Sequence, residues 1–339
     1  MTLPATVDFA APDLGATTSV QLRPRYEGSN ICTWIGFKHV NYLVEEAVLD
    51  HLRQAGLAPG ELYERFGLCV DLVDVDTRIL HAFHIDDEAT AEVGPPRGGP
   101  DGQLRFTVKI YVDRAERVQA VAAKVRVVLR LDPRGGGAEP IPAALTDHVV
   151  DRLGDGPTAT TPAIEPAGPD PLAVLVGDTN AVAWAWRMPY FYCHFTRRVQ
   201  MSGYLRLMEE VVDLFLAERG ISIRTLLDEQ DWIPVVPHSR ITILGEALME
   251  EVVHTVFTVE SVFKDFTYTA RMDCYVLRDG VLVPTATGRI THGYAVIENR
   301  RDWSLVAFDE RMLAGLAGPT TSSAASVAGR GTVHAGSRP

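Results

Sequence analysis

The sequence predicts an α+β protein in which two long helices are each wrapped by an antiparallel sheet. Two stretches, 40–54 and 203–219, carry apolar residues at helical spacing. Several runs after each of them alternate apolar and polar residues, as half-buried strands do. The two halves also share one register, because a shift of 164 residues places Glu209 on Glu45 (209 − 45 = 164). A repeat of this kind indicates one fold present twice in the chain.

The common register of the two halves extends beyond these glutamates. The same shift aligns Leu216 with Leu52, and Gly220 with Gly56, the glycines expected to end the two helices. Between the halves, residues 155–170 are rich in Pro, Thr, Gly and Ala, a composition typical of a linker. These boundaries predict a first repeat over 1–153, a linker over 154–182, a second repeat over 183–315 and a disordered tail over 316–339.

Strand patterns follow each predicted helix. They cover 68–91, 105–113 and 120–131 in the first half, and 241–244, 251–263, 266–277 and 288–297 in the second half. The Gly- and Pro-rich stretch 94–102 interrupts the first set and predicts a hairpin loop. Many strands against two long helices place the chain in the α+β class.

Composition and charge exclude several classes of function. With 339 residues, 46% of them apolar and 22% charged, the chain is typical of a soluble globular protein of two domains. It shows neither a secretory signal nor an apolar run of about 18 residues, so we expect a cytoplasmic protein without a membrane partner. The net charge of −12, spread along the chain, argues against nucleic acid as a partner.

Several common catalytic motifs are missing from the sequence. There is no glycine-rich phosphate loop, no HExxH or Cys/His metal spacing, and no Gly-x-Ser-x-Gly elbow. We therefore expect neither a metal nor a cofactor. What remains is a histidine, His194, where a strand gives way to a turn, and glutamates on the first turns of the two helices.

Two segments of the chain resemble known enzymes. Tyr190-Phe-Tyr-Cys-His-Phe195, followed by Met201-Ser-Gly-Tyr-Leu205 and Glu209, is similar to the active-site segment of hotdog-fold β-hydroxyacyl-thioester dehydratases. Tyr204-Leu-Arg-Leu-Met-Glu-Glu210 also resembles the helix start of hotdog acyl-thioesterases. The resemblance implies a double hotdog: two tandem hotdog repeats that share one continuous antiparallel sheet, with catalytic groups meeting across their interface.

The resemblance further implies a single working site. The dehydratase histidine falls on His194, whereas the first repeat has Asn30 at that place, and asparagine cannot act as a general base near pH 7. The expected catalytic pair is therefore His194 with Glu45 or Glu46 from the helix of the first repeat. Such a pair suits removal of an α-proton and protonation of a departing β-group. Two simpler interpretations stay open: glutamates that only favour the helix dipole, and a core histidine.

Other residues are expected to bind the substrate. Tyr192 belongs to an aromatic alternation whose inward half could line an acyl tunnel, and Arg198 is part of a basic patch for an acidic carrier protein. His39 stands in a His-Val-Asn segment similar to that of some plant acyl-carrier thioesterases, where we expect a pocket-lining or surface residue. The full set of expected substrate-binding residues is Asn30, Tyr192, Gly203, Tyr204, Arg198 and His39.

The expected function is that of an acyl-thioester enzyme acting on an acyl-CoA or acyl-carrier-protein substrate, in polyketide or fatty-acyl secondary metabolism. The first hypothesis is addition or elimination at Cβ of an enoyl or β-hydroxyacyl thioester, with water or an amine as nucleophile, and with thioester hydrolysis as an optional second step. The alternatives are a plain acyl-CoA or acyl-carrier-protein thioesterase and a non-catalytic acyl-binding protein. A homodimer is compatible with each of them.

Overall fold

The computed structural model describes residues 12–98, 101–135, 137, 139–153, 161–166, 168–193, 196–296 and 304–318. The first half contains β1 (Thr18–Leu22), α1 (Phe37–Gln54), α2 (Pro59–Phe66), β2 (Leu68–Ile79), β3 (Ala89–Val93), β4 (Arg97–Gly98), β5 (Leu104–Asp113), β6 (Arg117–Leu131), α3 (Ala143–Thr146) and β7 (Val149–Val150). The second half contains α4 (Pro171–Val176), β8 (Ala181–Arg187), α5 (Met201–Glu218), α6 (Ile223–Gln230), β9 (Trp232–Ile243), β10 (Val252–Phe263), β11 (Thr267–Arg278), β12 (Val281–Val296) and α7 (Glu310–Ala317). Short 3-10 turns, Tyr26–Gly28 and Tyr190–Tyr192, precede α1 and α5.

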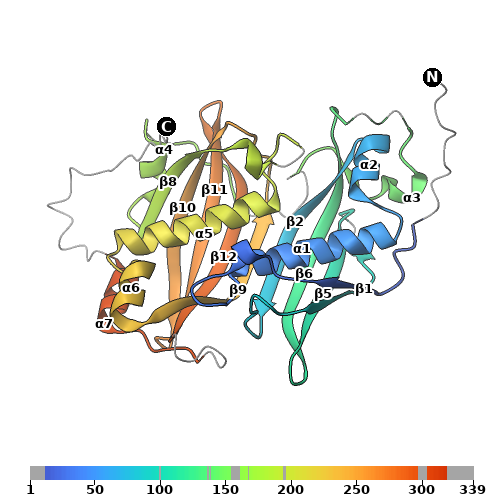
Figure 1. The fold of residues 1–339 in the computed structure, drawn as a ribbon. Helices are drawn as coiled ribbons and strands as arrows, with labels where there is room; N and C mark the ends of the chain where they lie inside the picture. Colours follow the sequence, from blue (N-terminus) through green and yellow to red (C-terminus); the bar gives the residue numbers. More distant parts are fainter. Residues whose placement is uncertain are drawn as a thin grey trace.

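The strands of both halves form one sheet. Their order is β1-β3-β5-β6-β2-β9-β12-β11-β10-β8, with β4 beside β5 and β7 beside β6. All these pairs are antiparallel except that of β7 with β6. Figure 1 shows α1 and α5 lying along the same face of this sheet, one over each half. The predicted continuous antiparallel sheet is therefore present among the described residues, with two long helices packed on it.

The elements of the two halves correspond at the offset found in the sequence. Helix α5 begins and ends 164 residues after α1 (201 − 37 = 164; 218 − 54 = 164). Strand β9 keeps the same offset from β2 (232 − 68 = 164; 243 − 79 = 164). Val40, Val44 and Val48 recur every four residues in α1 and are fully buried. Their counterparts Tyr204, Met208 and Val212 in α5 are buried as well, so the same helical spacing forms both helices.

The two halves are joined through β2 and β9. These strands pair from Asp74↔Thr242 to Arg78↔His238. Behind this seam, the buried side chain of Asn41 donates to Ser239 Oγ at 3.2 Å and accepts from Thr77 Oγ1 at 2.7 Å. Asn41 thus ties the first turns of α1 to both central strands, since unmet hydrogen bonds at buried polar groups are costly.

Two helices of the structure overlap the predicted linker and the predicted tail. Helix α4 lies inside the predicted linker 154–182, where Asp170 caps it by accepting from Leu172 N. Helix α7 extends into the predicted tail, because Leu316 is only 1% exposed and packs one turn after the fully buried Met312. The stretches 154–160 and 319–339 lie outside the described residues. No helix in the described part of the chain is long and apolar enough to cross a membrane.

Candidate functional site

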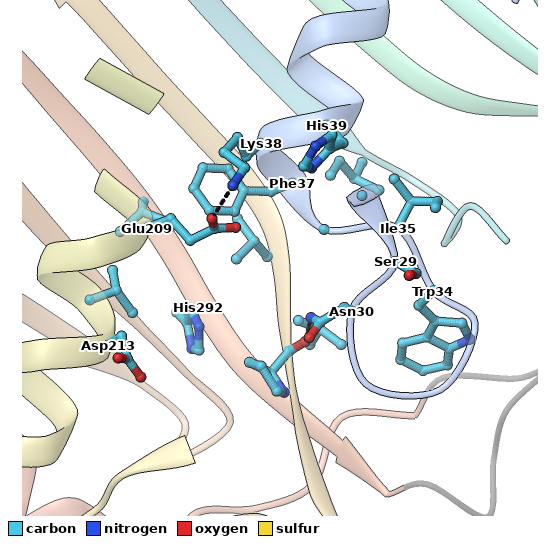
Figure 2. Close-up of a pocket in the computed structure, with 18 of the residues that line it drawn as sticks. Ser29, Asn30, Trp34, Ile35, Phe37, Lys38, His39, Glu209, Asp213 and His292 are labelled. Atoms are coloured by element: carbon cyan, nitrogen blue, oxygen red, sulfur yellow. Dashed lines mark hydrogen bonds and ion pairs between the residues drawn. The ribbon is translucent and has the colours of Figure 1, made fainter. Parts of the chain in front are cut away.

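A pocket of about 600 Å³ lies where the two halves meet. Figure 2 shows side chains from the first half on one side of it and side chains of α5 on the other. The first half contributes residues of the segment 27–39 together with Ile79 and Ala82. The second half contributes residues of α5, β9 and β12 together with Tyr192 and Ile223. The polar lining residues are Glu27, Ser29, Asn30, Lys38, His39, Tyr192, Arg206, Glu209, Glu210, Asp213 and His292. Both halves are therefore needed to form the pocket.

His39 is held in a defined orientation within this pocket. Its Nε2 lies 3.3 Å from Glu27 Oε1, and its ring meets Tyr42 edge-on at a centroid distance of 5.1 Å. A Cβ at Gly28 would lie 2.6 Å from His39 Cγ, so only glycine fits there. Because a carboxylate can only accept hydrogen bonds, Nε2 is the donor and Nδ1 is left as the acceptor nitrogen. Burial lowers the pKa of His39, against the raising effect of Glu27, so the imidazole is neutral near pH 7.

The first turn of α1 faces the same pocket. Its N-cap residue is Gly36, which offers no side chain to cap the helix. Gly36 N donates to Gly28 O at 2.9 Å, which fixes the loop that carries Glu27. Within the part of the chain that the structure describes, the N–H groups of Phe37 and Lys38 have no hydrogen-bond acceptor. An uncapped helix start of this kind favours a developing negative charge.

Helix α5 forms the opposite wall and is acidic. Glu209, Glu210 and Asp213 all line the pocket from it. Glu209 forms an ion pair with Lys38 across the two halves, drawn as a dashed line in Figure 2. On the same helix, Arg206 lies over the Tyr192 ring at 5.7 Å and donates to Tyr42 Oη at 3.3 Å. Lys38 and Arg206 thus partly offset the three carboxylates.

Three residues that line the pocket have charged counterparts at the 164-residue offset. Trp34, Ala82 and Val235 line the pocket, and their counterparts are Arg198, Glu246 and Asp71. Asp71 Oδ2 lies 3.2 Å from both Arg130 Nε and Arg198 Nη2. Glu246 lies 3.9 Å from the same two arginines. We call Asp71, Arg130, Arg198 and Glu246 the ionic cluster.

The residues expected to bind substrate divide into two groups. Asn30, Tyr192 and His39 line the pocket together. Arg198 does not, because it is 4% exposed and belongs to the ionic cluster. Tyr204 is fully buried in the core, and Gly203 packs under the loop, since a Cβ there would lie 2.9 Å from Tyr192 O.

Of the residues expected to act as catalysts, Glu45 and Glu46 do not line the pocket, and His194 lies outside the described residues. Glu46 is exposed and pairs with Arg53 at 2.6 Å. Glu45 is half-buried, and burial followed by the neighbouring charge of Glu46 raises its pKa to about 7. Its counterpart Glu209 has Lys38 as a partner, whereas the counterpart of Lys38 is the uncharged Ser202.

The raised pKa of Glu45 leads to a test of its role in stability. The folded state binds a proton at Glu45 between pH 4.5 and 7, where the unfolded state does not, so this contribution to stability is lost as the pH rises through 7. We expect Glu45→Gln to stabilise the protein at pH 8 by on the order of 2 kcal/mol and to change little at pH 4.5. Urea unfolding at both pH values measures this, with the exposed Glu46→Gln as control. A gain of equal size at both values would contradict it.

Sequence reasoning did not identify Glu27, Lys38, Arg206 or His292 as site residues. Only Lys38 carried a signal, because it is the charged residue directly before His39 in the His-Val-Asn segment. No group of three His, Cys, Asp or Glu side chains suited to a metal ion occurs among the described residues.

Comparison with known proteins establishes the fold. No protein-family model and no curated protein sequence matches the chain. Among solved structures, a protein assigned as an oleoyl thioesterase from Lactobacillus plantarum superposes with a TM-score of 0.56 at 13% identity, covering 82% of this chain and 96% of that one. The 12:0-ACP thioesterase from Umbellularia californica gives 0.55 at 11% identity, covering 82% and 97%. An acyl-ACP thioesterase from Bacteroides thetaiotaomicron gives 0.52 at 10% identity, covering 81% and 97%. These likenesses confirm the predicted hotdog fold.

Proposed function

We propose that this protein is an acyl thioesterase made of two hotdog repeats, which hydrolyses an acyl-CoA or acyl-carrier-protein thioester in the pocket between them. The constant offset of 164 residues between the elements of the two halves supports the repeat. Thioesterases that superpose over about four-fifths of the chain support hydrolysis more than chemistry at Cβ. The first hypothesis from the sequence, addition or elimination at Cβ, therefore becomes the second candidate.

The observation that carries this proposal is His39, held by Glu27 beside the uncapped start of α1. His39 Nδ1 takes a proton from a water molecule, and the water oxygen attacks the thioester carbonyl carbon. The carbonyl electron pair moves onto its oxygen, which is stabilised by the N–H groups of Phe37 and Lys38. When the intermediate collapses, the C–S bond breaks and the thiolate takes the proton back from His39. The products are a free acid and a thiol.

Two further contacts position these groups. Glu27 accepts from His39 Nε2, and this hydrogen bond lowers the pKa of Glu27, so the carboxylate stays charged and stabilises the imidazolium that forms. The Lys38–Glu209 pair holds α5 against the start of α1. It also engages the carboxylate that would otherwise compete with His39 as the base. The proposed base is therefore His39 rather than Glu209.

The wild-type protein tests this function directly. Saturated, enoyl and 3-hydroxyacyl thioesters of pantetheine and coenzyme A are incubated with the enzyme, and free thiol and enone absorbance are followed together. We expect thiol release from saturated chains, which have no double bond or β-hydroxyl group to react. Loss of enone without thiol would favour Cβ chemistry. Absence of both across short and long chains, on coenzyme A and on carrier protein, would favour the acyl-binding alternative.

A further inference from the structure

His292 is a buried polar residue that lines the pocket and packs against two aromatic rings. It lies on β12, where the pairing with β9 shifts register between Thr291 and Gly293. Its side chain lines the pocket although the residue is only 3% exposed. Figure 2 shows it among the lining side chains, between Asp213 and Asn30. Its counterpart at the 164-residue offset is Val128, so the first half has no equivalent polar group.

The hydrogen-bonding capacity of His292 is not used within the described residues. Its Nδ1 is buried without a partner. The rings packed on it are Tyr268 and Tyr294, with centroids at 5.2 and 5.3 Å, and their buried hydroxyl groups also lack partners among these residues. An unsatisfied buried polar group costs roughly 1–3 kcal/mol. Native proteins keep such groups where a ligand or an ordered water satisfies them.

The charge state of His292 limits what it can bind. Burial lowers its pKa to about 3, so the ring is neutral at physiological pH and offers one N–H donor and one acceptor nitrogen. Glu209, Glu210 and Asp213 line the same pocket and would repel a carboxylate on the substrate. A hydroxyl group, which is neutral and both donates and accepts, fits these two properties.

We propose that His292 recognises a hydroxyl group on the acyl chain, so that the pocket prefers hydroxylated acyl thioesters to plain ones. This inference rests on the proposed function for its substrate class. An unsubstituted chain would press CH₂ groups against the imidazole and leave its polar atoms unpaired. A site built around a hydrogen bond rejects the analogue that lacks the partner far more strongly than an apolar pocket rejects a missing methylene. We therefore expect the acyl chain of the substrate to carry a hydroxyl group that pairs with His292.

The test is a binding experiment that needs no turnover. Acyl-pantetheine analogues with CH₂ in place of the thioester sulfur are prepared at one chain length, either plain or with a single hydroxyl at successive carbons. Calorimetry with the wild-type protein should show about tenfold tighter binding or more for at least one hydroxyl position. In His292→Phe, which keeps an aromatic ring without polar atoms, the ratio should fall towards one. The matched control is His254→Phe, a buried histidine on β10 that does not line the pocket, and it should keep the wild-type ratio.

Each result decides a different claim. Equal affinity for plain and hydroxylated chains at every position overturns the subsite, and this arm uses only wild-type protein. A preference that survives in a folded His292→Phe variant overturns the role of His292. If hydroxylated chains bind more tightly but the matching thioesters release no thiol, the subsite is supported and the proposed hydrolysis is rejected. If all thioesters release thiol but no chain binds more tightly than another, the hydrolysis is supported and the subsite is rejected.

Discussion

Replacing His39 by glutamine is expected to lower kcat/KM for thioester hydrolysis by about 10²–10⁴, the usual range for a positioned general base. Glutamine is close in size and can still donate to Glu27, but it has no nitrogen that can take a proton from water. Because the loop contacts around Gly28 and Glu27 stay possible, the fold should be retained. Thiol release measures the loss, and circular dichroism and the melting temperature check the fold.

The pH dependence of the wild-type enzyme provides a second readout for His39. Burial lowers its pKa below the ordinary value of 6.5, so the acid limb of the wild-type profile should lie below pH 6.5. We expect kcat/KM to decline there as the pH falls, with a slope of one. His39→Gln should lose this acid limb, whereas a change that only damages structure would lower the whole profile without changing its shape.

Two other variants make the His39 assignment decisive. His51→Gln is a matched control on the same helix, since His51 does not line the pocket and bonds Thr18 instead, at 2.7 Å. His194→Ala tests the site expected from the resemblance to dehydratases. If His194→Ala abolishes hydrolysis while a folded His39→Gln keeps it, the expected pair of His194 and Glu45 is the working site and the present assignment is wrong.

Much of the fold could be predicted because its signals are local and present twice. The helical spacing of apolar residues such as Leu43, Val48 and Leu52 was enough to place α1 within three residues of its observed start. The shared register then placed α5 and β9 at the same offset. Periodicity of this kind reports which face of an element is buried, and it requires no knowledge of the partner.

The site was harder to predict because the repeat offers two regions related by the 164-residue offset, and the sequence does not say which of them forms a pocket. The repeat alignment favoured His194 and Glu45, since a histidine stood opposite Asn30. Among the described residues the pocket contains Asn30 and Glu209, whereas His194 lies outside them. Glu27 could not be assigned from sequence, because it comes from an exposed loop and meets His39 only through the turn at Gly28. That contact depends on the tertiary fold, which leaves no periodic pattern in the sequence.

The sequence does contain one sign that the pocket differs from the region related to it by the 164-residue offset. Trp34 and Ala82 beside the pocket correspond to Arg198 and Glu246, so an apolar pair is matched by a charged pair. Charged residues at positions that are apolar in the sister repeat indicate a changed environment. The burial of Arg198 and its position beside Glu246 became visible only in the structure.

The ionic cluster leads to the largest expected effect on stability. Asp71→Asn removes the only negative charge within 3.5 Å of Arg198 among the described residues. Arg198, 4% exposed, is then left with Glu246 at 3.9 Å, and Arg130, 3% exposed, with Asp132 at 3.6 Å and Glu246 at 3.9 Å. Burial raises the pKa of Asp71 to about 6 against the opposing effect of Arg130, so the carboxylate is charged at pH 8. Breaking a buried pair in this way typically costs 3–5 kcal/mol, because an uncompensated charge stays buried. We expect a loss of that size in urea unfolding at pH 8.

A variant that carries the pocket-wall residues at the cluster positions tests the opposite effect, a gain in stability relative to Asp71→Asn. In the triple variant Asp71→Val, Arg198→Trp and Glu246→Ala, each residue takes the identity of its counterpart at the 164-residue offset. Because replacing buried ion pairs by apolar groups is often neutral or stabilising, this variant should recover part of the stability that Asp71→Asn loses. Arg130 keeps Asp132 at 3.6 Å as a partner. A loss below about 1 kcal/mol for Asp71→Asn, comparable to that of the surface change Glu46→Gln, would contradict the expected cost of leaving the buried arginines of the ionic cluster without Asp71.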